Sequence, residues 1–143
     1  MVIGLVALLA GRASPATAQA PLVTGLGGAV GFGPNVLPAN DDGSSAAIPL
    51  ATAIPGGVTF YGTNYTSFYV NNNGDVTFGA PNATYTPQVF PIAGPVMIAA
   101  FFGDVDTRGL LTPAGRNQVY WALEPGRVVV TWYDVGYYNA HVN

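Results

Sequence analysis

The chain has 143 residues, the length of one domain, and half of them are hydrophobic while only 8% are charged. It has four arginines and no lysine against seven acidic residues, a net charge of −3, and so lacks the positive arrays that bind nucleic acid or anionic membranes. The absence of cysteine excludes a disulfide framework, a thiolate metal site and a cysteine nucleophile. Many glycines, prolines, aromatic and β-branched residues favour strands over long helices.

Residues 1–20 are predicted to be a signal peptide. Val2–Ala10 is an apolar run too short to span a bilayer, and small residues follow it at Ala16, Ala18 and Ala20. No basic residue precedes the run, so either the natural start is expected upstream or the sequence is a trimmed fragment. The alternative to a signal peptide is a buried strand or helix. The expected location is secreted or extracellular, and export without cysteines favours a bacterial protein.

Residues 21–39 are a Gly/Pro-rich lead-in, and the loop-like stretch 21–57 is expected to hold no more than one or two short edge strands. Residues 40–143 are expected to form the folded β domain. Asn40–Ser45 is a cluster of polar turn residues at its start. Gly57–Gly62, with the sequence GVTFYG, is predicted to be a strand.

The stretch YVNNNGDVTF, Tyr69–Phe78, predicts a β-hairpin with a polar tip. A two-residue loop would mix polar and apolar side chains on each face. A three-residue loop, Asn72–Gly74, pairs Val70 with Val76 and Phe68 with Phe78, which gives one apolar face. Burial therefore selects the three-residue loop, in which Gly74 takes a positive φ.

The second half of the chain predicts three more strands. Asn82–Pro95 is an irregular crossing segment because its prolines exclude a central strand. Val96–Phe102 lacks alternation and is predicted to be buried on both faces. Val119–Leu123 and Arg127–Tyr133 form a second hairpin around the turn EPG. The expected fold is an all-β, antiparallel β-sandwich-like domain with long Gly/Pro-rich loops.

Asp104 and Asp106 are the sharpest candidates for chemistry. Two residues apart on an extended segment, they would point the same way and could share a hard cation such as Ca²⁺. An EF-hand loop is rejected because its fifth position is Arg108 and its twelfth is Gly115. A looser Ca²⁺ site with help from Asp41 or Asp42 stays open. The alternative is that Arg108 neutralises one aspartate while the other caps a turn.

Catalysis has little support in the sequence. Two acids on one turn lie on the same side of a substrate, whereas glycosidases flank the bond they cleave. A Ser-His-Asp triad would depend on His141, and no nucleophile-elbow motif is present.

Two further sequence features permit a functional interpretation. Asn64–Thr66 and Asn82–Thr84 match the acceptor pattern for N-glycosylation, which matters only in a cell that glycosylates. Five aromatic residues on and after the second hairpin could stack against sugars, although such residues more often form core: they are Trp121, Trp132, Tyr133, Tyr137 and Tyr138.

Three motifs in order resemble the NIDO domain, the nidogen-like extracellular module. They are Tyr69-Val70-Asn71 with Asn73-Gly74 and Phe78-Gly79; Asp104-Val105-Asp106-Thr107; and Thr131-Trp132 with Val135-Gly136-Tyr137-Tyr138. The likeness runs from about residue 40 to Asn143. The family often has Trp before the acidic pair, where this chain has Phe102-Gly103, and continues beyond VGYY, so the last strand or strands are expected to be missing from residues 40–143.

The resemblance implies a non-catalytic extracellular module associated with cell–matrix adhesion. We expect loops on a rigid scaffold to bind an extracellular-matrix protein, a cell-surface protein or a glycan. The expected interaction loops are Asn71, Asn72, Asn73, Gly74 and Arg108, with no cofactor other than Ca²⁺ as a candidate ion. The alternatives are a Ca²⁺-dependent carbohydrate-binding module and, third, a glycoside-acting enzyme.

Overall fold

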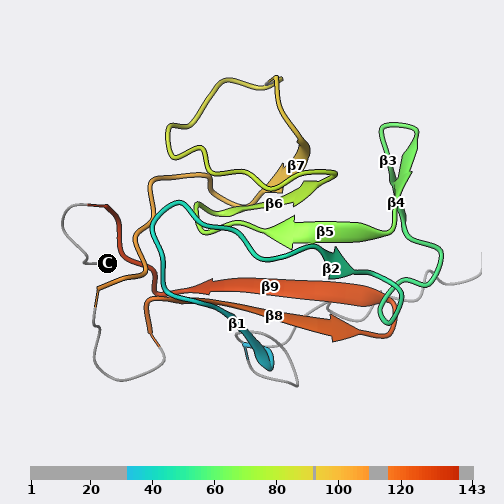
Figure 1. Cartoon of the computed structure of the whole chain (residues 1–143), viewed down its shortest axis with the longest axis horizontal. Helices are drawn as coiled ribbons and strands as arrows, with labels where there is room; N and C mark the ends of the chain where they lie inside the picture. Colours follow the sequence, from blue (N-terminus) through green and yellow to red (C-terminus); the bar gives the residue numbers. More distant parts are fainter. Residues whose placement is uncertain (1–31, 92, 110–115, 139–143) are drawn as a thin grey trace, which may run out of the picture.

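The computed structural model describes residues 32–91, 93–109 and 116–138. Within them the chain forms nine strands, all paired antiparallel, and no helix (Figure 1). The predicted all-β class is therefore confirmed. The predicted signal peptide at residues 1–20 lies outside the described residues.

Seven strands make two sheets, which Figure 1 shows one above the other, and two more make a projecting hairpin. The four-stranded sheet has the order β2 (Ile48–Pro49), β5 (Ser67–Val70), β6 (Asp75–Phe78), β7 (Val96–Ala99). The three-stranded sheet has the order β1 (Asn35–Leu37), β8 (Gln118–Glu124), β9 (Arg127–Tyr133). The hairpin consists of β3 (Val58–Phe60) and β4 (Thr63–Tyr65).

One apolar cluster joins the two sheets. Phe68 and Val70 of β5 and Val119 of β8 are at most 1% exposed, and they belong to the same buried cluster. Alternate residues of β9, among them Val128 and Val130, pack against it. Side chains with a period of two thus fill the space between the sheets, as in a sandwich.

The β5–β6 hairpin has the register that the sequence predicts. Val70 pairs with Val76, which leaves a three-residue loop at positions 72–74 between Asn71 and Asp75. Gly74 has a φ of 89°. A Cβ at this glycine would lie 2.6 Å from a ring carbon of Phe101, so the position restricts both conformation and space.

The β8–β9 hairpin is also confirmed and is the longest element pair. Glu124 pairs with Arg127 across the turn at Pro125-Gly126, and Gly126 has a φ of 81°. The side chains of Glu124 and Arg127 form an ion pair beside the turn. A two-residue loop with a left-handed glycine accounts for the tight connection.

The prediction that Val96–Phe102 is buried on both faces is wrong. Only Val96–Ala99 is a strand, and it pairs with β6 alone, at the edge of its sheet. Ile98 and Phe101 are 53% and 49% exposed. β7 is an edge strand: β6 pairs with one of its edges, and no strand of the described residues pairs with the other. Ile98 of this apolar run therefore lines an open groove.

The predicted strand at Gly57–Gly62 is half a hairpin. β3 ends at Phe60, and the chain reverses at Tyr61-Gly62, which have φ values of 48° and 79°. Tyrosine rarely takes a positive φ, so Tyr61 does not indicate a turn at this position.

Candidate functional site

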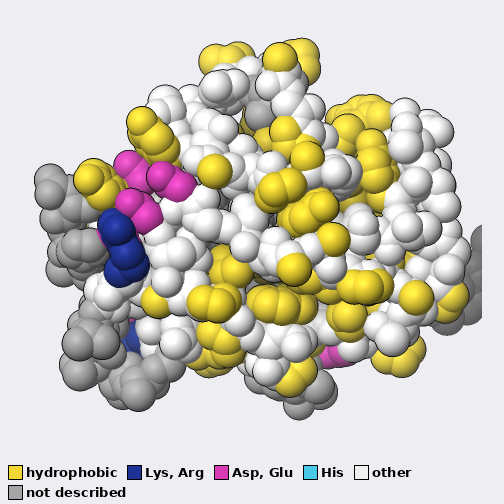
Figure 2. All heavy atoms as spheres, in the orientation of Figure 1, with side chains coloured by type: hydrophobic (Ala, Val, Ile, Leu, Met, Phe, Trp, Pro, Cys, Tyr) yellow, Lys and Arg dark blue, Asp and Glu magenta, His cyan; other side chains and the backbone are white. Residues whose placement is uncertain are grey.

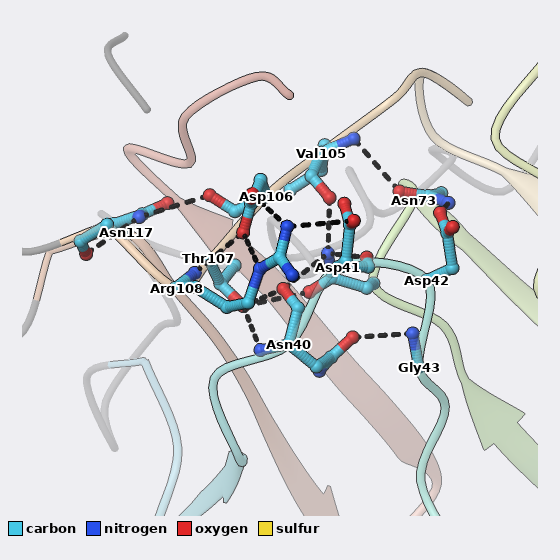
Figure 3. A network of polar contacts seen from close by, with 12 residues as sticks. Asn40, Asp41, Asp42, Gly43, Asn73, Val105, Asp106, Thr107, Arg108 and Asn117 are labelled. Carbon is cyan, nitrogen blue, oxygen red and sulfur yellow. Dashed lines mark hydrogen bonds and ion pairs between the residues drawn. The ribbon is translucent and has the colours of Figure 1, made fainter. Parts of the chain in front are cut away.

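The loops at one end of the sandwich meet in a polar cluster, shown in Figure 3. It brings together the turn at Asn40–Gly43, the β5–β6 loop and the segment Asp104–Arg108 that follows β7. Thr107 connects the turn at Asn40–Gly43 to the segment Asp104–Arg108. Its Oγ1 accepts from the Asn40 amide nitrogen and donates to the Asn40 carbonyl, both at 2.9 Å. Segments far apart in the chain are thus held as one unit.

The asparagines of the β5–β6 loop lie inside this cluster. Asn71, Asn72 and Asn73 are 0%, 1% and 1% exposed. Asn72 Nδ2 donates to the Val105 carbonyl at 2.6 Å, and the Val105 amide donates to Asn73 Oδ1 at 2.9 Å. Two buried amide side chains therefore satisfy both backbone groups of Val105, as buried polar groups require.

The tip of the β5–β6 hairpin is consequently not an exposed polar tip. The side chains of Asn71, Asn72 and Asn73 all make hydrogen bonds within the protein. That these residues and Gly74 form an interaction loop stays a prediction, and the structure shows what else they do. Asn73 Nδ2 donates to Asp42 Oδ1 at 2.8 Å and so positions a carboxylate of the neighbouring turn.

Trp132 of β9 links this loop to the other sheet. Its indole Nε1 lies 3.1 Å from the carbonyl of Asn71 and 3.0 Å from that of Asn72, and donates toward both. Its ring meets Phe101 edge-on, with centroids 5.8 Å apart. Trp132 and Trp121 both pack against the core, so of the five possible sugar-stacking aromatics these two act at least partly as core residues. Tyr137 and Tyr138 are more than half exposed.

Asp75 is a buried acid behind the loop. It is 0% exposed, and its Oδ2 accepts from Asn71 Nδ2 at 2.7 Å and Asn82 Nδ2 at 3.3 Å. Its Oδ1 is buried without a hydrogen-bond partner. Burial raises the pKa of Asp75 above its usual value, and the two amide donors oppose that rise.

Asp106 is engaged by Arg108. The guanidinium donates from Nε to Oδ1 at 2.9 Å and from Nη2 to Oδ2 at 2.7 Å, and Asp106 is 0% exposed. Arg108 Nη2 also reaches Asp41 Oδ2 at 2.9 Å. The hydrogen bonding of the Arg108 guanidinium to the Asp106 carboxylate is the main cause that raises the pKa of Arg108 above its usual value. The interpretation that Arg108 neutralises one aspartate of the pair is confirmed.

Asp104 joins a different group of acids. One carboxylate oxygen from each of Asp41, Asp42 and Asp104 lies within 4.8 Å of the others. These acids line a pocket of about 240 Å³ together with Tyr85 and Tyr138. Figure 2 shows acidic side chains gathered beside an arginine at this end of the molecule. We refer to this site as the acidic pocket.

The acidic pocket carries unfavourable negative charge. Desolvation raises the pKa of Asp41 and of Asp104, and neighbouring carboxylates raise both further; Arg108 opposes the rise at Asp41. Asp41 Oδ1 is buried without a hydrogen-bond partner. Such a site favours a ligand that brings positive charge, because a cation would reduce the repulsion among the acids.

The sequence suggested Asp104 and Asp106 as joint metal ligands. Those ligand roles stay predictions, but the structure groups Asp104 with Asp41 and Asp42 and places Asp106 against Arg108. The sequence predicts Asp41 or Asp42 only as additional ligands, because it does not show that Thr107 holds the turn at Asn40 against the segment after β7. His141 lies outside the described residues.

A second hollow is apolar and opens between the sheets beside β7. It has a volume of about 350 Å³. Its lining consists of Leu50, Ile54, Val58, Phe68, Val76, Phe78, Ile98, Ala100, Val128, Val130 and Trp132. No charged side chain contributes to this lining, so the groove is an incompletely covered part of the core rather than a polar site.

Comparison with known proteins identifies related sequences. The model of the nidogen-like domain matches residues 66–127. Human alpha-tectorin is 46% identical over 91 residues, which is 62% of this chain and 4% of that protein. Nidogen of Drosophila melanogaster is 40% identical over 65 residues, 46% of this chain and 5% of that protein; mouse nidogen-2 is 42% identical over 78 residues, 53% and 5%. No solved structure matches the chain significantly.

The chain thus spans about a twentieth of the length of these relatives. The match to the nidogen-like domain, with tectorin and nidogen as relatives, supports an extracellular module of the matrix type. No helix of the described residues has the length and apolar character needed to cross a bilayer. The matched segment holds β5, β6, β7 and β8, which include the central strands of both sheets. The resemblance to the NIDO domain is confirmed: residues 66–127 of this chain match the model of the nidogen-like domain.

Proposed function

We propose that this chain is a non-catalytic interaction module of the extracellular matrix, and that it binds its partner at the acidic pocket. The observation that carries the proposal is the convergence of Asp41, Asp42 and Asp104 on a pocket held by a buried asparagine network. The family match to matrix proteins supports the setting. The partner would be a matrix protein, a cell-surface protein or a glycan.

The buried network favours binding because it preorganises the pocket. Asn73 holds Asp42, and Asn72 and Asn73 hold Val105, the residue after Asp104. Loops fixed before binding lose little conformational freedom when a partner arrives. A basic side chain of the partner, flanked by the exposed rings of Tyr85 and Tyr138, would fit the pocket's charge and lining.

Chemistry on a glycosidic bond has less support. One member of the candidate acid pair, Asp106, is fully buried and held by Arg108 at both oxygens. The carboxylates of Asp41, Asp42 and Asp104 lie within 4.8 Å of one another rather than across a cleft. A glycosidase needs its two carboxyl groups on either side of the bond, about 5 to 9.5 Å apart.

The binding test uses an immobilised, solubilised extracellular-matrix preparation as the probe. Replacing Asp42→Asn and Asp104→Asn together should weaken equilibrium binding about tenfold or more, since close charge pairs across an interface contribute about 1.5 kcal/mol or more. Glu124→Gln is the matched control, because Glu124 lies at the β8–β9 turn at the other end of the sheet. Equal binding by the double variant and the control would disprove the site.

A second candidate is Ca²⁺ in the acidic pocket, as a Ca²⁺-dependent carbohydrate-binding module requires. Three convergent carboxylates and the unpartnered Asp41 Oδ1 favour it, since Ca²⁺ takes oxygen ligands. Calorimetry of chelator-treated protein with CaCl₂ should show binding heat that Asp104→Asn abolishes and Glu124→Gln retains. Absence of heat in the folded wild type would remove this candidate, and a glycan panel with and without Ca²⁺ tests the carbohydrate.

A further inference from the structure

The two acceptor sequences for N-glycosylation, Asn64–Thr66 and Asn82–Thr84, have opposite environments in the structure. We propose that Asn64 is a modification site that carries an N-linked oligosaccharide when the chain passes through a glycosylating secretory pathway, and that Asn82 is not. The inference does not depend on the proposed partner or on the acidic pocket.

Asn64 lies in a position that can carry a large group. It belongs to β4, which pairs only with β3 in the described residues, and the two strands form a hairpin that projects from the sheets (Figure 1). Both Asn64 and Thr66 are exposed, while Tyr65 between them packs toward the core. Both residues that the transferase recognises therefore lie on the outside of the protein.

Little structure depends on the Asn64 amide. Its Nδ2 makes one hydrogen bond, to the Gly56 carbonyl at 3.1 Å, and that bond is exposed to solvent. Solvent can replace an exposed bond of this kind at small cost. A glycan here would also shield Tyr61 of the same hairpin, which is 86% exposed. A bulky, solubilising group at this surface is compatible with the fold.

Asn82 lies in the opposite situation. It is 8% exposed, and its Nδ2 donates to Oδ2 of the buried Asp75. Its Oδ1 accepts from the Thr84 amide at 3.2 Å, and its own backbone amide donates to Asn71 Oδ1 at 3.1 Å. A sugar on Nδ2 would have to occupy the space next to Asp75, so a chain modified there could not close this network.

The transfer reaction needs a lipid-linked oligosaccharide diphosphate as donor. Asn64 Nδ2 forms a bond to the anomeric carbon, the bond from that carbon to the phosphate oxygen breaks, and the lipid diphosphate leaves with the electron pair. The amide nitrogen gives up one proton to a base of the transferase. The hydroxyl of the residue at the third position is part of the recognised sequence, so its removal blocks transfer without changing the asparagine.

The test compares two matched threonine substitutions in full-length chain secreted from a eukaryotic host behind a cleavable leader. Thr66→Ala and Thr84→Ala each destroy one acceptor sequence and leave the backbone bonds intact. Tryptophan fluorescence confirms that the secreted protein is folded. Mass spectrometry after enzymatic glycan release then locates modified asparagines by their conversion to aspartate.

We expect wild type and Thr84→Ala to carry one glycan, at position 64, and Thr66→Ala to carry none. Folded wild type without a glycan at Asn64 would overturn the proposal. Folded wild type with a glycan at Asn82 would overturn its second half, because it would show that the bond to Asp75 is dispensable.

Discussion

At the scale of single residues, the asparagines of the β5–β6 loop explain how the loop end is held together. An asparagine side chain offers both a carbonyl acceptor and two N–H donors, so one buried residue can satisfy backbone groups of another segment. Asn72 and Asn73 together accept from and donate to Val105, and Asn73 also holds Asp42. Their contribution is therefore structural, and it reaches the acidic pocket through the residues that they position.

This arrangement predicts that Asn73→Ala destabilises the domain by about 1 to 3 kcal/mol, because the Val105 amide would be buried without an acceptor. Urea unfolding followed by tryptophan fluorescence measures the change. Asn64→Ala is the control, since Asn64 is exposed and its substitution should stay within about 0.5 kcal/mol. Equal effects of the two substitutions would show that the buried amide is not needed.

The buried Asp75 predicts a pH effect with a definite sign. Its pKa is raised in the folded state, so the native protein binds more protons than the unfolded chain between the two pKa values. Its contribution therefore favours folding at low pH and is lost as pH rises through the raised pKa. Asp75→Asn removes this titration while its amide oxygen can still accept from Asn71 and Asn82.

We accordingly expect the free energy of unfolding of Asp75→Asn, relative to wild type, to increase as pH rises from about 4 toward neutrality. Urea titrations of both proteins across that range measure the difference. Asp41 and Asp104, whose pKa values are also raised, are present in both proteins, so we expect their effects to cancel in the comparison. A difference that is constant with pH would contradict the account of Asp75.

At the scale of elements, local sequence patterns predict the two hairpins well, but they do not predict which strands flank one another in a sheet. The register of β5–β6 followed from one-sided burial of Val70 and Val76, and the turn at Pro125-Gly126 from its residue types. Burial of Val96–Phe102 could not be read from the sequence, because an apolar run does not state how many strands flank it. The acidic pocket was hidden for a related reason: its members lie about 60 residues apart and meet only through tertiary contacts.

Because the sheet is open at the edge of β7, truncation of two isomeric side chains that line the same groove should lower the free energy of unfolding by unequal amounts. Leu50→Ala should cost about 2 to 5 kcal/mol because Leu50 is 2% exposed. Ile98→Ala should cost clearly less because Ile98 is 53% exposed. Chemical denaturation of the two variants measures both changes, and similar costs would mean that Ile98 is covered in solution.

At the scale of the whole molecule, the described residues separate three surfaces on one scaffold. The acidic pocket occupies one end of the sandwich, the apolar groove opens beside β7, and the β3–β4 hairpin projects near the other end (Figures 1 and 2). A glycan on the hairpin would leave the acidic pocket accessible. The division assigns partner binding to loops and stability to the strands behind them, as is common for modules on a rigid β scaffold.

The most direct test of the central claim is a hydrogen–deuterium exchange footprint of the wild-type chain on the solubilised matrix preparation. We predict slower exchange on binding in Asn40–Gly43, in Asp104–Arg108 and at Tyr137–Tyr138, with no change in β3, β4 or the β8–β9 turn. Protection confined to the hairpin or to the β8–β9 turn, with the three loop segments unchanged, would contradict the assignment of partner binding to the acidic pocket.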